Sequence, residues 1–116
     1  IFNVGSFADL DPIENSVAYS ASKGAVRALT KAIARDLQHI DADIEVHEWI
    51  PGHLNTQMSG FTGSDPSIAA GWAVQLAGMP RARTRNCIFV NDREWRPPKR
   101  LKDRLKEKLL FWRTFE

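Results

Sequence analysis

The sequence has 116 residues, of which 43% are hydrophobic, and its formal net charge at pH 7 is +2. This length and composition are typical of one modest globular domain, and they argue against a chain that is disordered throughout. The charge is unevenly distributed: residues 1–92 carry a net charge of −3 and residues 93–116 carry +5, so the basic character belongs to the last segment.

The sequence carries no signal for membrane insertion or secretion. No apolar run approaches the roughly 18 residues needed to span a bilayer, and the first residues do not resemble a signal peptide. We therefore expect a cytoplasmic location. The three histidines lack the spacing of metal ligands relative to a cysteine or a carboxylate pair, so no metal site is predicted.

The first half of the chain predicts a strand followed by a long helix. The opening IFNVGS has the apolar residues of a buried strand and ends at Gly5 and Ser6. After a loop rich in Asp, Pro and Asn, apolar residues recur at steps of three and four from Val17 to about Ile40, which predicts an amphipathic helix. Its apolar stripe consists of Val17, Ala21, Ala25, Leu29, Ile33, Leu37 and Ile40.

The second half repeats the alternation of strand and helix. The stretch IEVHEWI, residues 44–50, predicts a second strand that Pro51-Gly52 ends. Asp65-Pro66 predicts the start of a helix that runs to about Ala77, with proline in its first turn. The apolar CIFV, residues 87–90, predicts a third strand, and Pro97-Pro98 precede a last helix with a leucine stripe.

This order of elements predicts the fold class. Strands that alternate with helices form an α/β fold with a parallel sheet. Three strands would leave the first one as an unpaired apolar edge, so we expect the sequence to be a fragment whose missing part precedes Ile1. Residues 1–92 are expected to form one portion of a domain, and residues 93–116 to form a basic amphipathic helix.

Ser6, Tyr19 and Lys23 are the constellation that points to chemistry. Ser6 ends the first predicted strand, and ligands of open α/β sheets bind at the carboxyl ends of strands. Tyr19 and Lys23 are four residues apart in the predicted helix, so they share one face, about 5–6 Å apart at Cβ. The cation would favour the phenolate, which would let the phenol exchange a proton with a carbonyl or alcohol oxygen. Taken alone, the same spacing also fits a solvated surface pair.

Three segments in register resemble the short-chain dehydrogenase/reductase family. NVGS, YSASKGAV and IPGHLNT match, in order and spacing, that family's serine strand, its Tyr-x-x-x-Lys helix and its proline-glycine turn. The resemblance covers roughly residues 1–90. It implies the C-terminal half of a doubly wound, parallel-sheet Rossmann-like fold, with about three strands and three helices present.

The resemblance also implies a function and a set of site residues. The function is reversible hydride transfer between NAD or NADP and a small-molecule carbonyl or alcohol substrate. Tyr19 corresponds to the acid/base, Ser6 to the hydroxyl that orients the substrate, and Lys23 to the cation that activates Tyr19 and binds the nicotinamide ribose. With Tyr19 and Lys23, the expected cofactor-binding residues are those of the turn that meets the nicotinamide: Pro51, Gly52, Leu54 and Thr56.

The sequence departs from the family's pattern at both ends. The family's glycine-rich phosphate loop, its adenosine-recognising residue and the Asn of its catalytic tetrad precede the serine strand, so this sequence contains none of them. NAD and NADP therefore both remain candidates, and residues 1–116 alone are expected to be inactive. The family's usual glycine-rich ending is replaced by the basic segment NDREWRPPKRLKDRLKEKLLFW.

An alternative interpretation is a non-catalytic oligomerisation or docking module derived from the same fold. The helix from Val17 to Ile40 would then serve only as a subunit interface, and under either interpretation we expect a homo-oligomer that forms through it. The basic tail is expected to pack its leucines, although a basic face can also bind an acidic membrane or nucleic acid. We expect neither a nucleic-acid nor a membrane partner, because the tail lacks interleaved aromatic residues and the intact Ser6, Tyr19 and Lys23 set favours the enzyme.

Overall fold

The computed structural model describes residues 1–40, 43–80 and 87–96. Within them, four strands form one sheet in the order β1 (Phe2–Val4), β2 (His47–Ile50), β3 (Ile88–Val90) and β4 (Arg93–Trp95). The first three strands are parallel, with Val4 opposite Trp49 and Trp49 opposite Phe89. The α/β class and the parallel pairing of the three predicted strands are confirmed.

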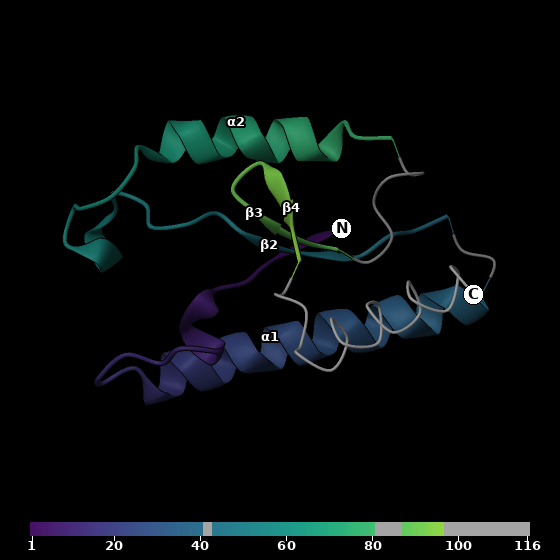
Figure 1. Cartoon of the computed structure of the whole chain (residues 1–116), viewed down its shortest axis with the longest axis horizontal. Coiled ribbons are helices and arrows are strands. Elements are labelled where there is room, and N and C mark those ends of the chain that lie inside the picture. The colour runs from purple at the N-terminus through teal and green to yellow at the C-terminus, as the bar shows by residue number, and fades with distance from the viewer. Residues whose placement is uncertain (41–42, 81–86, 97–116) are drawn as a thin grey trace, which may run out of the picture.

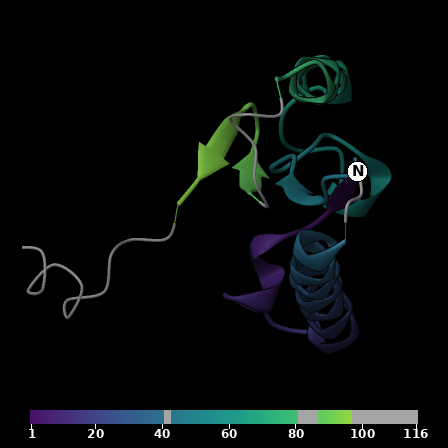
Figure 2. The same cartoon turned by 90° about the vertical axis from the view of Figure 1, so that its right-hand side faces the viewer.

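Two helices lie on opposite faces of this sheet (Figures 1 and 2). Helix α1 (Val17–Asp36) connects β1 with β2, and α2 (Pro66–Ala77) lies between β2 and β3 in the chain. Short 3-10 turns follow β1 (η1, Phe7–Asp9), α1 (η2, Leu37–His39) and the loop after β2 (η3, Gln57–Ser59). In the described part of the chain, no helix combines the length and the apolar character that crossing a bilayer requires.

The strand β4 is an addition that the sequence did not predict. It pairs antiparallel with β3 through a tight connection in which Asn91 has a φ of 56°. The indole of Trp49 donates a hydrogen bond to the Asn91 carbonyl at 2.9 Å, which ties this turn to β2. Residues 93–95 therefore continue the sheet and do not belong to the basic amphipathic helix that the sequence predicts over 93–116. The helix predicted after Pro97 lies outside the described residues.

Helix α1 turns an unexpected face toward the sheet. Its buried residues are Ser20, Arg27, Thr30 and Ala34, three of which are polar or charged. Much of the predicted apolar stripe faces away, since Val17 is 84% exposed and Leu29 is 56% exposed, while Ile33 and Leu37 are half-buried. The helix is therefore amphipathic as predicted, but its most apolar side is left open in the described structure.

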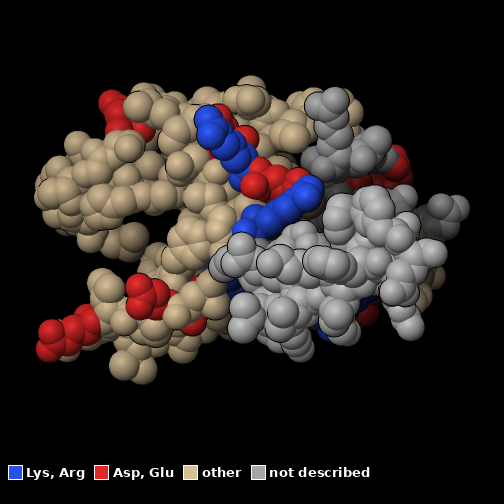
Figure 3. All heavy atoms as spheres, viewed as in Figure 1, with Lys and Arg blue, Asp and Glu red and all other residues tan. Residues whose placement is uncertain are grey.

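The core is small and lies on the two faces of β2 and β3. Its fully buried apolar side chains are Ala34, Val46, Ile50, Ala69, Leu76 and Phe89. On the surface, Lys and Arg side chains lie beside Asp and Glu in the face that Figure 3 shows. Arg96 and Glu94 form one exposed ion pair, with 3.0 Å between Nε and Oε1. The described surface in this view is therefore mixed in charge.

Candidate active site at the carboxyl ends of β1 and β2

Ser6 lies where the chain leaves β1, and its hydroxyl begins the next turn. The Ser6 Oγ accepts a hydrogen bond from the Ala8 N–H at 3.1 Å and thereby caps η1. Because the oxygen acts as the acceptor in this bond, the hydroxyl hydrogen stays available to a second partner. The half-buried Ser6 can therefore donate to a ligand oxygen without losing its cap.

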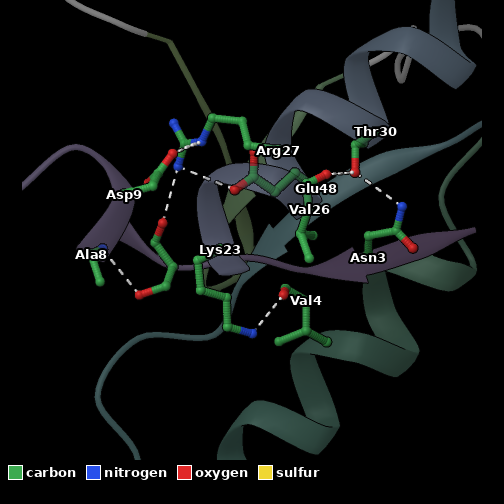
Figure 4. Close-up of polar contacts among 10 residues, drawn as sticks. Asn3, Val4, Ala8, Asp9, Lys23, Val26, Arg27, Thr30 and Glu48 are labelled. Atoms are coloured by element: carbon green, nitrogen blue, oxygen red, sulfur yellow. Dashed lines mark hydrogen bonds and ion pairs between the residues drawn. The ribbon is translucent and has the colours of Figure 1, made fainter. Parts of the chain in front are cut away.

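Lys23 connects the helix to the end of the same strand. Its Nζ donates a hydrogen bond to the Val4 carbonyl at 3.0 Å, and Val4 is the last residue of β1 (Figure 4). The same nitrogen lies 5.6 Å from the centroid of the Tyr19 ring. Since an ammonium has three donors, at least one remains for a ligand after this bond is made.

Tyr19 lies one turn before Lys23, with its phenol open to solvent. Tyr19 is 38% exposed, and no described residue forms a hydrogen bond with its hydroxyl. The structure thus brings Tyr19 and Lys23 together. It also bonds Lys23 to Val4, which precedes Ser6 by two residues in the chain. The catalytic roles of these three residues stay predictions.

The turn after β2 leaves the sheet at the same edge. Because β1 and β2 run parallel and the Gly5 N–H donates to the Trp49 carbonyl at 2.8 Å, Ser6 and Pro51 leave the sheet side by side. Gly52 has a φ of 84°, which disfavours any residue with a Cβ. A Cβ there would also lie 2.9 Å from Oδ1 of Asn91. The strand β2 ends at Ile50, directly before Pro51-Gly52, as predicted.

The loop beyond this turn is held by its own hydrogen bonds. The Thr56 side chain accepts from the Ser59 N–H, and the Thr56 N–H donates to Ser59 Oγ at 3.0 Å, forming a capping box on η3. Leu54 forms an isolated bridge with Ser64, and the Leu54 carbonyl accepts from Ser59 Oγ. The Thr56 hydroxyl therefore accepts a hydrogen bond inside its own loop, and the cofactor-binding roles of Pro51, Gly52, Leu54 and Thr56 stay predictions.

A buried charge cluster beneath Ser6 was not predicted from the sequence. Arg27 contacts Asp9 (Nε to Oδ2, 2.6 Å) and Glu48 (Nη2 to Oε1, 3.1 Å). The exposed fractions of these side chains are 8% for Arg27, 6% for Asp9 and 2% for Glu48. Arg27 Nη2 also donates to the Ser6 carbonyl at 3.1 Å, so the cluster reaches the site (Figure 4). We refer to Asp9, Arg27 and Glu48 as the charge cluster.

Burial dominates the electrostatics of the charge cluster. It raises the pKa of Glu48; Arg27 opposes this rise and Asp9 adds to it. The two carboxyl groups thus share one guanidinium. Gly5 is part of the packing, because a Cβ at this position would overlap the Glu48 carboxylate. A carboxylate in the middle of the apolar stretch IEVHEWI needs a buried partner, and that is the signal that could have predicted the cluster.

The donors at this edge of the sheet fit one part of a nicotinamide cofactor. The free donors of Lys23 suit the hydroxyls of a ribose, and the Tyr19 hydroxyl is unpartnered within the described residues. The Pro51-Gly52 turn brings backbone close to the same edge without a bulky side chain. The residues present therefore fit the nicotinamide riboside.

Comparison with known proteins agrees with this arrangement. The chain matches the sequence model of a family described as short chain dehydrogenase over residues 1–67, which include Ser6, Tyr19, Lys23 and the turn after β2. No solved structure matches.

Three curated relatives have the following similarities. The chain is 34% identical over 65 residues to a 2,5-dichloro-2,5-cyclohexadiene-1,4-diol dehydrogenase of Sphingobium indicum, with 56% of this chain and 25% of the relative covered. It is 40% identical over 58 residues to a CLA biosynthesis dehydrogenase/reductase of Lactiplantibacillus plantarum, with 50% and 20% covered. It is 34% identical over 70 residues to 3beta-hydroxysteroid dehydrogenase 1 of Eggerthella lenta, with 60% and 26% covered.

These matches cover only part of each relative. The aligned segments span between 20% and 26% of the relatives' own length. The family match, in contrast, covers more than half of this chain and contains all three segments that the sequence singled out. We conclude that the chain belongs to the short-chain dehydrogenase family.

Proposed function

We propose that the complete protein containing this chain is an oxidoreductase that transfers a hydride reversibly between NAD or NADP and a small carbonyl or alcohol. The observation that carries the proposal is the placement of Lys23, whose Nζ bonds the last carbonyl of β1 and lies beside the Tyr19 ring. This contact ties the phenol-bearing face of α1 to the strand end that carries Ser6. Family membership and the dehydrogenase names of the relatives support the same class of reaction.

Each side chain has a distinct role in this proposal. The nicotinamide supplies or accepts the hydride when it is bound. Tyr19 donates a proton to the substrate oxygen when a carbonyl is reduced and accepts one when an alcohol is oxidised. Ser6 donates a hydrogen bond to that oxygen, using the hydrogen its cap leaves free. Lys23 stabilises the phenolate form of Tyr19 by its charge and donates to the ribose hydroxyls.

The direct test is an assay of the complete protein. Reduction of NAD or NADP is followed by absorbance with a panel of linear, cyclic and steroidal secondary alcohols, and the reverse reaction is followed with the matching ketones. We expect turnover with one of the two cofactors. Absence of turnover with both cofactors across the whole panel would contradict the proposal.

Replacing Lys23 by alanine should weaken cofactor binding as well as turnover. The substitution removes charged hydrogen bonds worth about 1.5–3 kcal/mol, so we expect the cofactor dissociation constant to rise about tenfold or more. Calorimetric titration with NAD and NADP measures this change. The matched control is Arg35→Ala, which removes an exposed cation from the same helix and should bind cofactor like the wild type. Equal affinities of Lys23→Ala and the wild type would remove the ribose contact from the proposal.

We also propose that copies of the protein associate through α1. The exposed stripe that includes Val17, Ala21, Ala25 and Leu29 supports this interface, because such a continuous apolar surface is typical of protein contacts.

Leu29→Glu should weaken the assembly by about tenfold or more, because each buried leucine contributes about 1.5–3 kcal/mol. Analytical ultracentrifugation measures the assembly. The matched control is Val74→Glu on α2, where the replaced side chain is 76% exposed. Loss of assembly in the control alone would place the interface elsewhere.

A further inference from the structure

Arg27 is the buried cation that joins three segments around Ser6. It contacts Asp9 on η1, Glu48 on β2 and the carbonyl of Ser6 between β1 and η1. More than nine-tenths of each of the three side chains of the charge cluster is buried. Figure 4 shows the Arg27 side chain between Asp9 and Glu48, with dashed lines for both ion pairs.

The segment around Ser6 is also held by other contacts, among them the Phe7 ring on η1, whose centroid lies 5.6 Å from that of Trp95. Gly5 is held to β2 by its N–H, and the Ser6 Oγ is held by the Ala8 N–H. The orientation of the peptide between Ser6 and Phe7 depends on the bond from Arg27 Nη2, and the position of η1 depends on the ion pair with Asp9. The direction in which the Ser6 hydroxyl points is thus set partly by the guanidinium.

A role in stability alone accounts poorly for such a cluster. A buried ion pair repays the cost of desolvating its charges only when its geometry is very good, and apolar replacements are often as stable. Here three buried atoms of the charge cluster, Asp9 Oδ1, Glu48 Oε1 and Arg27 Nε, have no hydrogen-bond partner among the described residues, although Arg27 forms ion pairs with both carboxylates. A guanidinium, in contrast, offers several donors in one rigid fork and can hold separate acceptors in a fixed arrangement.

We propose that Arg27 is a positioning residue, which holds the Ser6 carbonyl and η1 so that the Ser6 hydroxyl meets the substrate oxygen. This proposal rests on the proposed function, because it gives Ser6 its role in the reaction. Lysine cannot replace arginine here, since a single ammonium on a shorter reach cannot hold Asp9, Glu48 and the Ser6 carbonyl together.

The hold of Arg27 on Ser6 and η1 is tested without any substrate. Amide hydrogen exchange of the complete protein, followed by NMR, reports on the Ala8 N–H that donates to Ser6 Oγ. In Arg27→Lys we expect exchange of the Ala8 amide to accelerate about tenfold or more, while amides in the middle of α1 keep their rates. The matched control is Arg35→Lys, an exposed arginine on the same helix, which should leave the Ala8 amide unchanged. Wild-type exchange at Ala8 in Arg27→Lys would overturn the proposal.

The catalytic consequence is tested by a double-mutant cycle. Arg27→Lys should lower kcat about 10–100-fold with the cofactor KM within about twofold, because small misplacement of a reacting group has effects of this size. In a Ser6→Ala background the same substitution should lower kcat by less than about twofold, because the group that Arg27 positions is already gone. If Arg27 had a purely structural role, the kcat losses of Arg27→Lys and Ser6→Ala would multiply in the double variant. That result would overturn the proposal.

Two outcomes separate this proposal from the proposed function. If the wild type turns over no substrate, the proposed function fails and the catalytic role of Arg27 fails with it, while exchange at Ala8 still decides whether Arg27 holds Ser6. If the wild type is active and Arg27→Lys changes neither the exchange of the Ala8 amide nor kcat, only the positioning role of Arg27 fails. If Arg27→Lys does not fold, Asp9→Asn is the second variant. It keeps the Arg27 cation and weakens only the ion pair that holds η1. It should accelerate Ala8 exchange in the same direction, and unchanged exchange would overturn the proposal.

Discussion

Replacing Tyr19 by phenylalanine should lower kcat of the complete protein about 10²–10⁴-fold and leave cofactor affinity nearly unchanged. Only the transferable proton is lost, and general acid/base help by a positioned side chain is worth about that factor. The fold should not suffer, because the hydroxyl has no hydrogen-bond partner among the described residues and the residue is 38% exposed. Steady-state kinetics, a titration with cofactor and a melting curve measure the three effects separately.

A matched control removes another exposed hydroxyl from the same part of α1. Ser22→Ala deletes the bond from Ser22 Oγ to the Tyr19 carbonyl at 2.7 Å and leaves the phenol in place. It should turn over substrate like the wild type. If Tyr19→Phe retained more than about a tenth of the wild-type kcat, Tyr19 would not be the acid/base. A matching loss in Ser22→Ala would mean that local helix structure, and not the phenol, explains the effect.

Local signals in the sequence predicted the parts of the fold that position the site. Asp65 caps α2 by accepting from the Ser67 N–H at 2.8 Å, with Pro66 in the first turn as expected. The turn at Gly52 has the positive φ that a proline-glycine pair favours. These features depend on neighbouring residues alone, which is why a sequence pattern is enough to predict them.

The orientation of α1 required information from distant segments. Apolar periodicity marks the side from Val17 to Leu29, yet the sheet receives the side with Arg27 and Thr30. Arg27 can be buried only because Asp9 and Glu48 arrive from η1 and β2 to pair with it. No single stretch of sequence contains that arrangement, so the charge cluster escaped prediction together with its contact to Ser6.

Two further features of the fold had no local signal. The strand β4 is short and mostly charged, so it lacks the apolar alternation that predicts a strand. Helix α2 lies on the face opposite α1 (Figure 2), and its own apolar residues do not say which face of the sheet it covers. In both cases tertiary contacts decide the outcome.

Replacing Arg27 by methionine should reduce the free energy of unfolding of the complete protein by about 3–5 kcal/mol at neutral pH. The methionine fills much of the space but leaves the Asp9 and Glu48 carboxylates buried without the guanidinium that pairs with both, with exposed fractions of only 6% and 2%. Denaturant unfolding followed by tryptophan fluorescence measures the loss, since Trp49 lies on β2 beside Glu48. A loss below about 1 kcal/mol would mean that the carboxylates find other partners.

The pH dependence of the unfolding free energy tests whether the buried Glu48 carboxylate causes this loss. Burial already raises the pKa of Glu48, and the charge of Arg27 holds this rise back, so in Arg27→Met the pKa should rise further. A carboxyl whose folded pKa lies above its unfolded value stabilises the fold below the unfolded pKa, near 4.3, and loses that contribution as pH rises through the folded pKa. The deficit of Arg27→Met relative to the wild type should therefore be largest at neutral pH and shrink as pH falls toward about 4.3. Adding Glu48→Gln removes this ionisation and should flatten the trend, whereas a deficit that does not change with pH would assign the loss to packing around the new methionine.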